Sequence, residues 1–332
     1  MGRNDVRILN AATLPAAIRR LAPYAKLPLA VVSPASPLPK DRRSDLDRGL
    51  ERLRALGFEP VLGKSVLAAD GYLAGDDAAR AADLQEAFGD PELRGVFCVR
   101  GGYGVTRLLD RLDFAPLAKD PKPILGYSDV TALLAAAWRE VGLVGCHGPM
   151  VATSESMASG KELDAQQHAL LTEVKRATPL PLQDGERPHA LRIGRAEGRL
   201  VGGNLTLVTA LLGTPWEIDT TGALLFLEDT GEAPYRVDRM LTQLRATGHL
   251  RRCAGVVLGD FHLDDQPMCS LDPEMLRVFR DRLADLPCPV AYGFPFGHRP
   301  RSWTLPVGAR ARLDARDESA LARLELLEPA VR

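Results

Sequence analysis

Short apolar runs alternate with amphipathic helical patterns along the first half of the chain. The apolar runs are strand candidates because turn residues bound each of them. They lie at residues 27–33, 58–62, 95–99, 124–125 and 143–146. The spacing of apolar residues between them predicts helices over residues 41–56, 76–88, 106–112 and 132–141. Strands that alternate with helices in this way predict an α/β fold with a doubly wound, mostly parallel sheet.

The second half of the chain has a different pattern. Periodicity fades between about Ala158 and Arg195, where several prolines and the pair Asp184-Gly185 are typical of a linker. Further on, the pattern predicts strands at 223–227, 255–258 and 290–292, helices ending near Leu212 and Thr247, and a β-hairpin over 304–313. We therefore expect an N-terminal α/β domain over residues 1–160, a linker region over 161–195, and a more antiparallel α+β domain over 196–332.

Composition excludes some classes of partner. The chain has 332 residues, of which 45% are hydrophobic and 26% are charged, as in a globular protein. At roughly 100–200 residues per domain, this length fits two domains. The 42 Lys and Arg residues nearly balance the 43 Asp and Glu residues, which gives a net charge of −1. A chain with this charge balance has no net positive electrostatic field that would attract a polyanion, so we expect neither a nucleic-acid nor a membrane partner.

Targeting and metal signals are also missing from the sequence. The first residues lack the apolar core of a signal peptide, and no run of about 18 apolar residues occurs, so we expect a cytoplasmic protein. The five cysteines are odd in number and have no C-x-x-C spacing, which indicates neither a disulfide framework nor a structural zinc site. A dinucleotide motif after Gly102 would need glycine where Arg107 stands. We expect no metal and no cofactor.

Several polar loops follow the predicted strands of the first domain. They comprise the Ser33 loop, Arg100-Gly101-Gly102-Tyr103-Gly104, the turn at Ser128 and His147-Gly148-Pro149-Met150. Ligands of doubly wound sheets bind outside the carboxyl ends of the strands. We therefore expect these loops to line one cleft.

The segment Pro123-Ile124-Leu125-Gly126-Tyr127-Ser128-Asp129-Val130-Thr131 is typical of a nucleophile elbow. A serine on a tight turn between a strand and a helix exposes its hydroxyl, and the N–H groups at the start of the helix can stabilise an oxyanion. This chemistry suits acyl transfer. The usual motif has glycine at the fifth position, where this chain has Val130. The alternative is that Ser128 is an ordinary helix N-cap.

The paired glycines Gly101 and Gly102 are candidates for a close backbone approach to a substrate. Their N–H groups, together with the N–H of Asp129, can form an oxyanion hole. The alternative is a plain tight turn.

A serine nucleophile needs a base and a carboxylate that orients it. Of the six histidines, His147 at a strand end and His298 in a Gly- and Pro-rich loop are the two candidates for the base. A carboxylate ends the apolar run at 224–227, but spacing alone does not rank Glu228, Asp229 and Glu232.

Four segments together resemble the LD-carboxypeptidase family of serine peptidases. They are Val99 to Gly104; Gly126 to Thr131 with His147 to Met150; Gly202-Gly203-Asn204-Leu205 to Phe226-Leu227-Glu228-Asp229; and Phe296-Gly297-His298. The resemblance covers most of the chain but has no counterpart for about the first 25 residues. It implies that Ser128 is the nucleophile, His298 the general base and Glu228 its orienting carboxylate. It further implies an oxyanion hole at Gly101, Gly102 and Asp129, an active site between two domains, and a homodimer.

The resemblance also implies an activity. Such an enzyme hydrolyses the bond between an L-centre, diaminopimelate or lysine, and the terminal D-alanine of murein tetrapeptides during cell-wall recycling, without a metal. The carboxylate of such a substrate would need a cationic partner. By position, the candidate substrate contacts are Arg100, Tyr103, Arg236, Arg239 and Arg299.

Two alternatives stay open. One is the other branch of the family, the microcin C immunity peptidases, which hydrolyse peptidyl or aminoacyl sulfamoyl adenylates. Those relatives carry an inserted aromatic residue, whereas residues 150–199 of this chain contain no Trp, Tyr or Phe. The other alternative is a non-catalytic muropeptide-binding protein, which would not need Ser128, Glu228 and His298 together.

Overall fold

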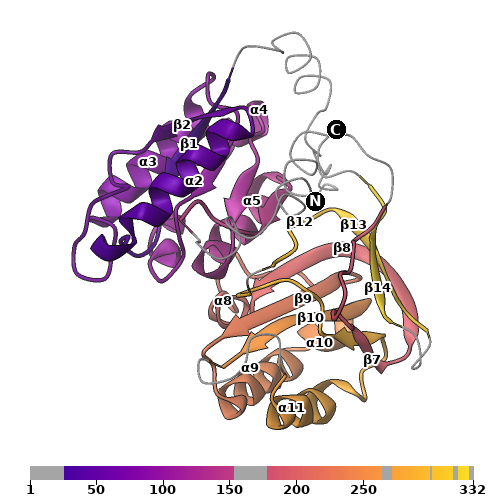
Figure 1. Cartoon of the computed structure of the whole chain (residues 1–332). Helices are drawn as coiled ribbons and strands as arrows, with labels where there is room; N and C mark the ends of the chain where they lie inside the picture. Colours follow the sequence, from indigo (N-terminus) through magenta and orange to yellow (C-terminus); the bar gives the residue numbers. More distant parts are fainter. Residues whose placement is uncertain (1–25, 153–177, 264–270, 300, 317–320, 329–332) are drawn as a thin grey trace. The chain divides into compact units, whose positions relative to one another are not determined.

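The computed structural model describes residues 26–152, 178–263, 271–299, 301–316 and 321–328 (Figure 1). It divides into two compact units, and the division falls between Val174 and Lys175. Residues 1–25 and residues 161–177 of the predicted linker over 161–195 lie outside the described residues, whereas residues 178–195 include short β-strands. Within the described residues, no helix has the length and apolar character needed to span a membrane.

The first unit is a parallel sheet with helical connections. Its strands are β1 (Leu27–Val32), β2 (Phe58–Leu62), β3 (Val96–Cys98), β4 (Ile124–Gly126) and β5 (Gly145–His147). Its α-helices are α2 (Arg43–Ala55), α3 (Asp77–Gly89), α4 (Ala115–Lys119) and α5 (Thr131–Val141). The strands pair in the order β2-β1-β3-β4-β5, all parallel. The predicted doubly wound arrangement is confirmed.

Short helices of the 3-10 type complete this unit. They are η1 (Lys40–Arg42), η2 (Val105–Arg107), η3 (Leu109–Arg111) and η4 (Ser128–Val130). The segment predicted to be helical over 106–112 forms two short 3-10 helices, η2 and η3, in place of one continuous helix. The N–H of Val105 donates to the carboxylate of Asp129 at 2.8 Å, and this tertiary contact fixes the start of so short a segment.

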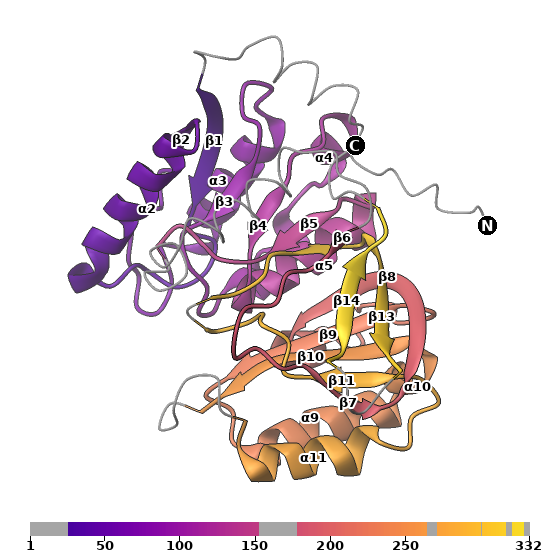
Figure 2. The ribbon, with the colours of Figure 1, turned by 45° about the vertical axis from the view of Figure 1, so that its right-hand side comes forward.

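The second unit contains one mixed, strongly curved sheet. Its strands are β6 (Thr178–Pro179), β7 (His189–Arg192), β8 (Gly194–Asn204), β9 (Leu224–Thr230), β10 (Gly255–His262), β11 (Val290–Tyr292), β13 (Arg310–Ala315) and β14 (Arg323–Leu326). The short strand β12 (Leu305–Val307) is not part of this sheet. Strands β8, β9, β10 and β11 are parallel, and antiparallel strands flank them. Long β8 bends, so that its first part pairs with β13 and its last part with β9 (Figure 2).

The hairpin predicted over 304–313 is wrong. Strands β12 and β13 belong to different sheets, and β13 pairs with β8 and β14. The turn between β12 and β13 bonds to β8 instead, since Gly308 N donates to Leu200 O and Leu200 N donates to Ala309 O at 2.8 Å. Strand β8, which lies more than a hundred residues earlier in the chain, thus pairs with β13 in the place that the hairpin prediction gave to β12.

Among the described residues of the second unit, four α-helices accompany the sheet. They are α8 (Leu205–Ala210), α9 (Pro234–Ala246), α10 (His249–Arg252) and α11 (Pro273–Leu283). Both α9 and α11 lie side by side against the sheet in Figures 1 and 2. The ring of Phe279 on α11 meets that of Phe261 on β10 edge to face, with centroids 5.0 Å apart. Local signals set the helix starts: Asn204 caps α8, and Asp272 with Pro273 starts α11.

Each unit has its own core of buried apolar side chains. In the first unit, α2 packs through Leu46, Leu50 and Leu53 against apolar residues of β1 and β3. In the second, β9 begins with the fully buried run Leu224-Leu225-Phe226-Leu227. A continuously apolar strand is what a parallel sheet covered on both faces requires.

Close approach between strands β8 and β9 leads to a prediction about stability. A Cβ at Gly202, where φ is +130°, would overlap the backbone of Phe226. We expect Gly202→Ala to lower the free energy of unfolding by about 2–4 kcal/mol in urea denaturation. The matched control is Gly213→Ala, because Gly213 also has positive φ but has open space around its Cβ position. Its cost should be about 1 kcal/mol. Equal losses for the two variants would contradict this account.

Candidate active site

Ser128 stands in an unusual backbone conformation at the end of β4. Its φ is 61°, and among the described residues it is the one non-glycine residue with positive φ. This left-handed conformation costs about 1–2 kcal/mol for an L-residue. The N-cap alternative is wrong, because Tyr127 precedes η4 and Val130 precedes α5, with no side-chain cap at either position. A serine with positive φ in a tight turn after a strand is the backbone arrangement that a nucleophile elbow requires.

The residue at the fifth position of the motif, Val130, is explained by packing. A Cβ at Gly126 would lie 2.7 Å from Cγ1 of Val130. The glycine before the serine is therefore required by the valine after it. The tight turn is achieved with one small residue and one branched residue, where the usual motif has two glycines.

Gly101 lies directly against Ser128. A Cβ at Gly101 would be 2.9 Å from Cβ of Ser128, 3.0 Å from its Oγ and 3.4 Å from the backbone N of Asp129. The structure thus brings the predicted nucleophile, the first glycine of the pair and the N–H of Asp129 together. Gly102 has φ +117° and approaches Ser36, whose Oγ accepts a hydrogen bond from the N–H of Tyr103 at 3.1 Å.

The side chain of Asp129 is a buried carboxyl group behind this turn. It accepts the N–H of Val105 at Oδ2, whereas its Oδ1 has no hydrogen-bond partner among the described residues. Burial raises the pKa of Asp129 to about 6, although the bond from Val105 and the charge of Arg80 oppose the rise. Arg80 is itself buried and donates to Gly104 O at 3.1 Å. The loop 101–105 is therefore tied to α3 through Arg80 and to η4 through Asp129.

His298 and Glu228 form a close pair in the second unit. His298 Nδ1 lies 2.7 Å from Oε2 of Glu228, which is completely buried at the end of β9. A Cβ at Gly297 would lie 2.8 Å from the same oxygen, so glycine is needed there for the loop to approach the carboxylate. Gly297 N donates to Ser302 Oγ at 3.0 Å, which fixes the loop from its other side.

The electrostatics of the pair favour a charged imidazole. Burial lowers the pKa of His298, but the charge and hydrogen bond of Glu228, with the charges of Asp229 and Asp260, more than offset burial. The net pKa of His298 is above its ordinary value. Nδ1 faces Glu228, so Nε2 lies on the opposite side of the imidazole ring.

The structure separates the three carboxylates that spacing did not rank. Glu228 contacts His298, whereas Asp229 turns to Asn204 Nδ2 at 2.8 Å and to Thr206 Oγ1 at 2.8 Å. Burial, followed by the charge of Glu228, raises the pKa of Asp229 to about 6. Glu232 pairs with Arg236 at the surface, 3.5 Å away. Of the three, Glu228 is the carboxylate that orients a histidine.

The other predicted residues lie in varied settings. His147 is completely buried, with its ring 5.9 Å from that of Tyr127. Arg100 Nη1 donates to Pro37 O at 2.9 Å, and burial lowers its pKa. Tyr103 is exposed and its ring lies 5.8 Å from that of Tyr72. Arg236 and Arg239 are exposed on α9, and Arg299 lies 3.5 Å from Glu186.

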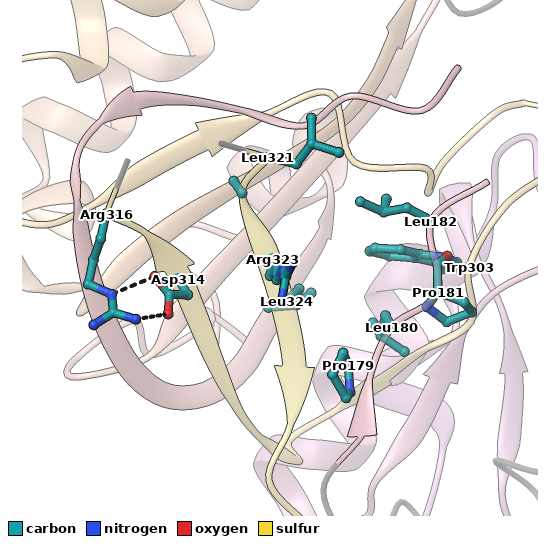
Figure 3. Close-up of a pocket in the computed structure, with 11 residues that line it drawn as sticks. Pro179, Leu180, Pro181, Leu182, Trp303, Asp314, Arg316, Leu321, Arg323 and Leu324 are labelled. Atoms are coloured by element: carbon teal, nitrogen blue, oxygen red, sulfur yellow. Dashed lines mark hydrogen bonds and ion pairs between the residues drawn. The ribbon is translucent and has the colours of Figure 1, made fainter. Parts of the chain in front are cut away.

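A separate cavity of about 730 Å³ opens in the second unit beside β14 (Figure 3). Leu180, Leu182, Leu324 and the ring of Trp303 line it, and Arg316 pairs with Asp314 at its side. None of the predicted site residues lines it. Within the part of the chain that the structure describes, its lining contains no serine, cysteine or histidine.

Sequence reasoning missed Asp260. It lies on β10 beside Glu228 and contributes to the electrostatics of His298. The signal was present, because Asp260 follows the apolar run of β10 much as Glu228 follows that of β9.

Comparison with known proteins gives two family matches. The model described as the LD-carboxypeptidase N-terminal domain matches residues 29–148, and that of the LD-carboxypeptidase C-terminal domain matches residues 197–313. The N-terminal match contains Ser128, and the C-terminal match contains both Glu228 and His298.

Individual relatives cover nearly the whole chain. One is a Bacillus subtilis protein named "Probable murein peptide carboxypeptidase", 39% identical over 91% of this chain and 93% of the relative. The structure of muramoyltetrapeptide carboxypeptidase from Oxalobacter formigenes matches with a TM-score of 0.75 and 33% identity over 90% of this chain and 99% of that chain. The microcin C7 self-immunity protein MccF of Escherichia coli is 28% identical over 88% of this chain and 93% of the relative.

The raised pKa of Asp129 leads to a prediction on pH dependence. The folded protein holds a proton on Asp129 up to about pH 6, whereas the unfolded chain loses it near the ordinary carboxyl value, so wild-type stability falls as pH rises between these values. Asp129→Asn removes this loss. We expect the difference in free energy of unfolding between Asp129→Asn and the wild type to shift in favour of the variant by about 2 kcal/mol from about pH 4 to pH 7.

Urea denaturation over this pH range measures the difference. Asp110→Asn, at an exposed carboxyl group, is the matched control and should show no such gain. A stability difference between Asp129→Asn and the wild type that is constant with pH would contradict the assignment.

Proposed function

Since this chain belongs to the LD-carboxypeptidase family, we propose that it is a serine-type carboxypeptidase that removes the terminal D-alanine of murein tetrapeptides. The backbone of Ser128 is the observation that carries this proposal. A positive φ at a serine directly against Gly101 and the N–H of Asp129 is strain that a plain turn would not retain. The hydrogen bond of Glu228 to His298 supplies the second half of the chemistry.

The proposed mechanism follows from these groups. Oγ of Ser128 attacks the carbonyl carbon of the scissile bond, and Nε2 of His298 takes the hydroxyl proton. Glu228 stabilises the resulting imidazolium, while the N–H groups of Asp129 and the Gly101-Gly102 turn bind the oxyanion. The intermediate collapses, His298 returns the proton to the leaving amine, and water then hydrolyses the acyl-enzyme.

The specificity that we propose extends the family assignment. The scissile bond runs from an L-centre, diaminopimelate or lysine, to a D-residue, which places the enzyme in recycling of cell-wall peptides in the cytoplasm. Arg100, Arg236, Arg239 and Arg299 are the proposed cationic partners of the substrate carboxylate, and Tyr103 is a proposed substrate contact. We propose that the working form is a homodimer, which light scattering on the purified protein tests.

An alternative substrate class comes from the likeness to MccF. A serine peptidase with this machinery can also cleave the acyl bond of an aminoacyl sulfamoyl adenosine. Parallel incubation with aspartyl sulfamoyl adenosine and with a murein tetrapeptide decides between the two substrates. A muropeptide-binding protein without catalysis would leave both intact.

The first test concerns the nucleophile. The wild type should release D-alanine from a murein tetrapeptide, detected by mass spectrometry, and Ser128→Ala should lose at least about 10³-fold in kcat. The matched control is Ser44→Ala, an exposed serine on α2, which should keep full activity. A tetrapeptide ending in L-alanine tests the specificity. Release by both the wild type and Ser128→Ala would show that another residue is the nucleophile.

The second test concerns the orienting carboxylate. Glu228→Gln leaves a group of the same shape but without charge, so it no longer stabilises the imidazolium of His298. We expect kcat to fall by about 10³–10⁴-fold while KM changes little. A loss below about tenfold would remove Glu228 from the mechanism.

The third test concerns the approach of Gly101 to Ser128. The methyl group of Gly101→Ala would press against Cβ and Oγ of Ser128 and displace the hydroxyl. We expect kcat to fall by about 100-fold, as is typical of a displaced catalytic group. Gly89→Ala is the matched control, because nothing lies within 4 Å of its Cβ position. Wild-type kcat in Gly101→Ala would show that this contact does not position the nucleophile.

A further inference from the structure

Asp260 lies beside Glu228 at an irregularity of the sheet. Strands β9 and β10 pair Leu227 with Leu258 and Asp229 with Phe261, so two residues of β10 face the single residue Glu228. Such a bulge redirects a side chain, and alternation from Phe261 puts Asp260 on the same face as Glu228. The N–H of Asp260 donates to Phe296 O at 2.9 Å. That bond ties Asp260 to the loop that carries His298.

The carboxylate of Asp260 differs from its neighbour in how it is bonded. Asp229 has both oxygens occupied, by Asn204, Thr206 and Thr230. Asp260 is also buried, with 9% of its surface exposed, but its Oδ2 has no hydrogen-bond partner among the described residues. A buried oxygen without a partner costs about 1–3 kcal/mol. The protein retains the Asp260 carboxylate beside His298 despite this cost in stability, and such a buried group without a partner needs an explanation.

The charges that face Asp260 come from three elements. Burial raises its pKa to about 6, while Arg299 and His298 from the loop after β11 and His262 from β10 lower it, and Glu228 from β9 raises it. Arg299 pairs in turn with Glu186, which also binds Arg301. His298 is faced by Glu228 and Asp229 from β9 and by Asp260 from β10. Asp260 thus adds a negative charge on the β10 side of the imidazole.

We propose that Asp260 is a positioning residue for His298: its carboxylate supports Glu228 in stabilising the imidazolium that forms when His298 takes the proton of Ser128. Glu228 fixes the orientation of the ring through a hydrogen bond, and Asp260 acts through space as a second charge. In this way the histidine becomes a stronger base than Glu228 alone would make it. The inference rests on the proposed function for its kinetic part, whereas the charge effect on His298 is a property of the protein without substrate.

Asp260→Asn tests the proposal because it keeps the shape and removes the charge. The ring resonances of the histidines are followed by NMR from about pH 4 to pH 9 in the substrate-free protein, with His298→Gln to assign His298. We expect the titration midpoint of His298 to fall by about one pH unit, because the variant lacks a negative charge that favours the imidazolium. The acid limb of the pH profile of kcat/KM should move down by the same amount, and kcat should fall about three- to tenfold.

Two further variants separate charge from structure. Asp260→Glu keeps the charge and should retain a midpoint near that of the wild type. Asp314→Asn makes the same change of charge on β13, where the carboxylate pairs with Arg316, and should move neither the midpoint nor the profile. Asp260→Ser supplies a second neutral variant should Asp260→Asn fail to fold. A purely structural role would lower stability and activity at all pH values without moving the limb.

The outcomes distinguish this inference from the proposed function. An unchanged His298 midpoint in a folded neutral variant overturns the inference, whatever the enzyme hydrolyses. A shifted midpoint with an unshifted kcat/KM profile overturns the positioning role. If the wild type hydrolyses no murein peptide, the proposed function fails, and the NMR titration still decides whether Asp260 acts on His298.

Discussion

The complete burial of a carboxylate at the end of β9 is the constraint on which the second unit depends. An unpaired buried charge would cost several kcal/mol, so Glu228 needs a close and well-oriented partner. His298 provides it at 2.7 Å, and the loop can approach because residue 297 has no side chain. Ser302, β10 and the bulge at Asp260 then hold that loop. The long curved sheet thus presents one rigid acid–histidine pair.

In the first unit, the corresponding constraint is the strained backbone of one serine. The positive φ of Ser128 persists because its surroundings determine it: Gly126 accommodates Val130, and Gly101 leaves room for the serine side chain. Asp129 and Arg80 hold the facing loop through buried polar contacts. Each contact serves to place one hydroxyl group and the N–H groups around it.

Buried carboxyl groups recur in both units at a cost in stability. Burial raises the pKa of Asp129, Asp229 and Asp260 to about 6 in each case, so each group opposes folding near neutral pH. Asp129 and Asp229 hold backbone segments that carry site residues, whereas Asp260 has an oxygen without a partner. Buried carboxyl groups with raised pKa values are typical of functional sites, where stability is given up for function.

The amino-acid pattern was enough to predict the parallel sheet of the first unit, the turn at Ser128 and the candidates for its partners. Those features follow from local patterns: apolar runs, helix periodicity and residues at strand ends. The folded structure was needed to establish that 106–112 forms two short 3-10 helices, that β13 pairs with β8, and that Glu228 rather than Asp229 or Glu232 contacts a histidine. The position of Asp260 next to Glu228 likewise depends on the pairing of β9 with β10. These outcomes depend on contacts between residues far apart in the chain, which periodicity does not encode, because burial and pairing are set by whichever partner the fold brings near.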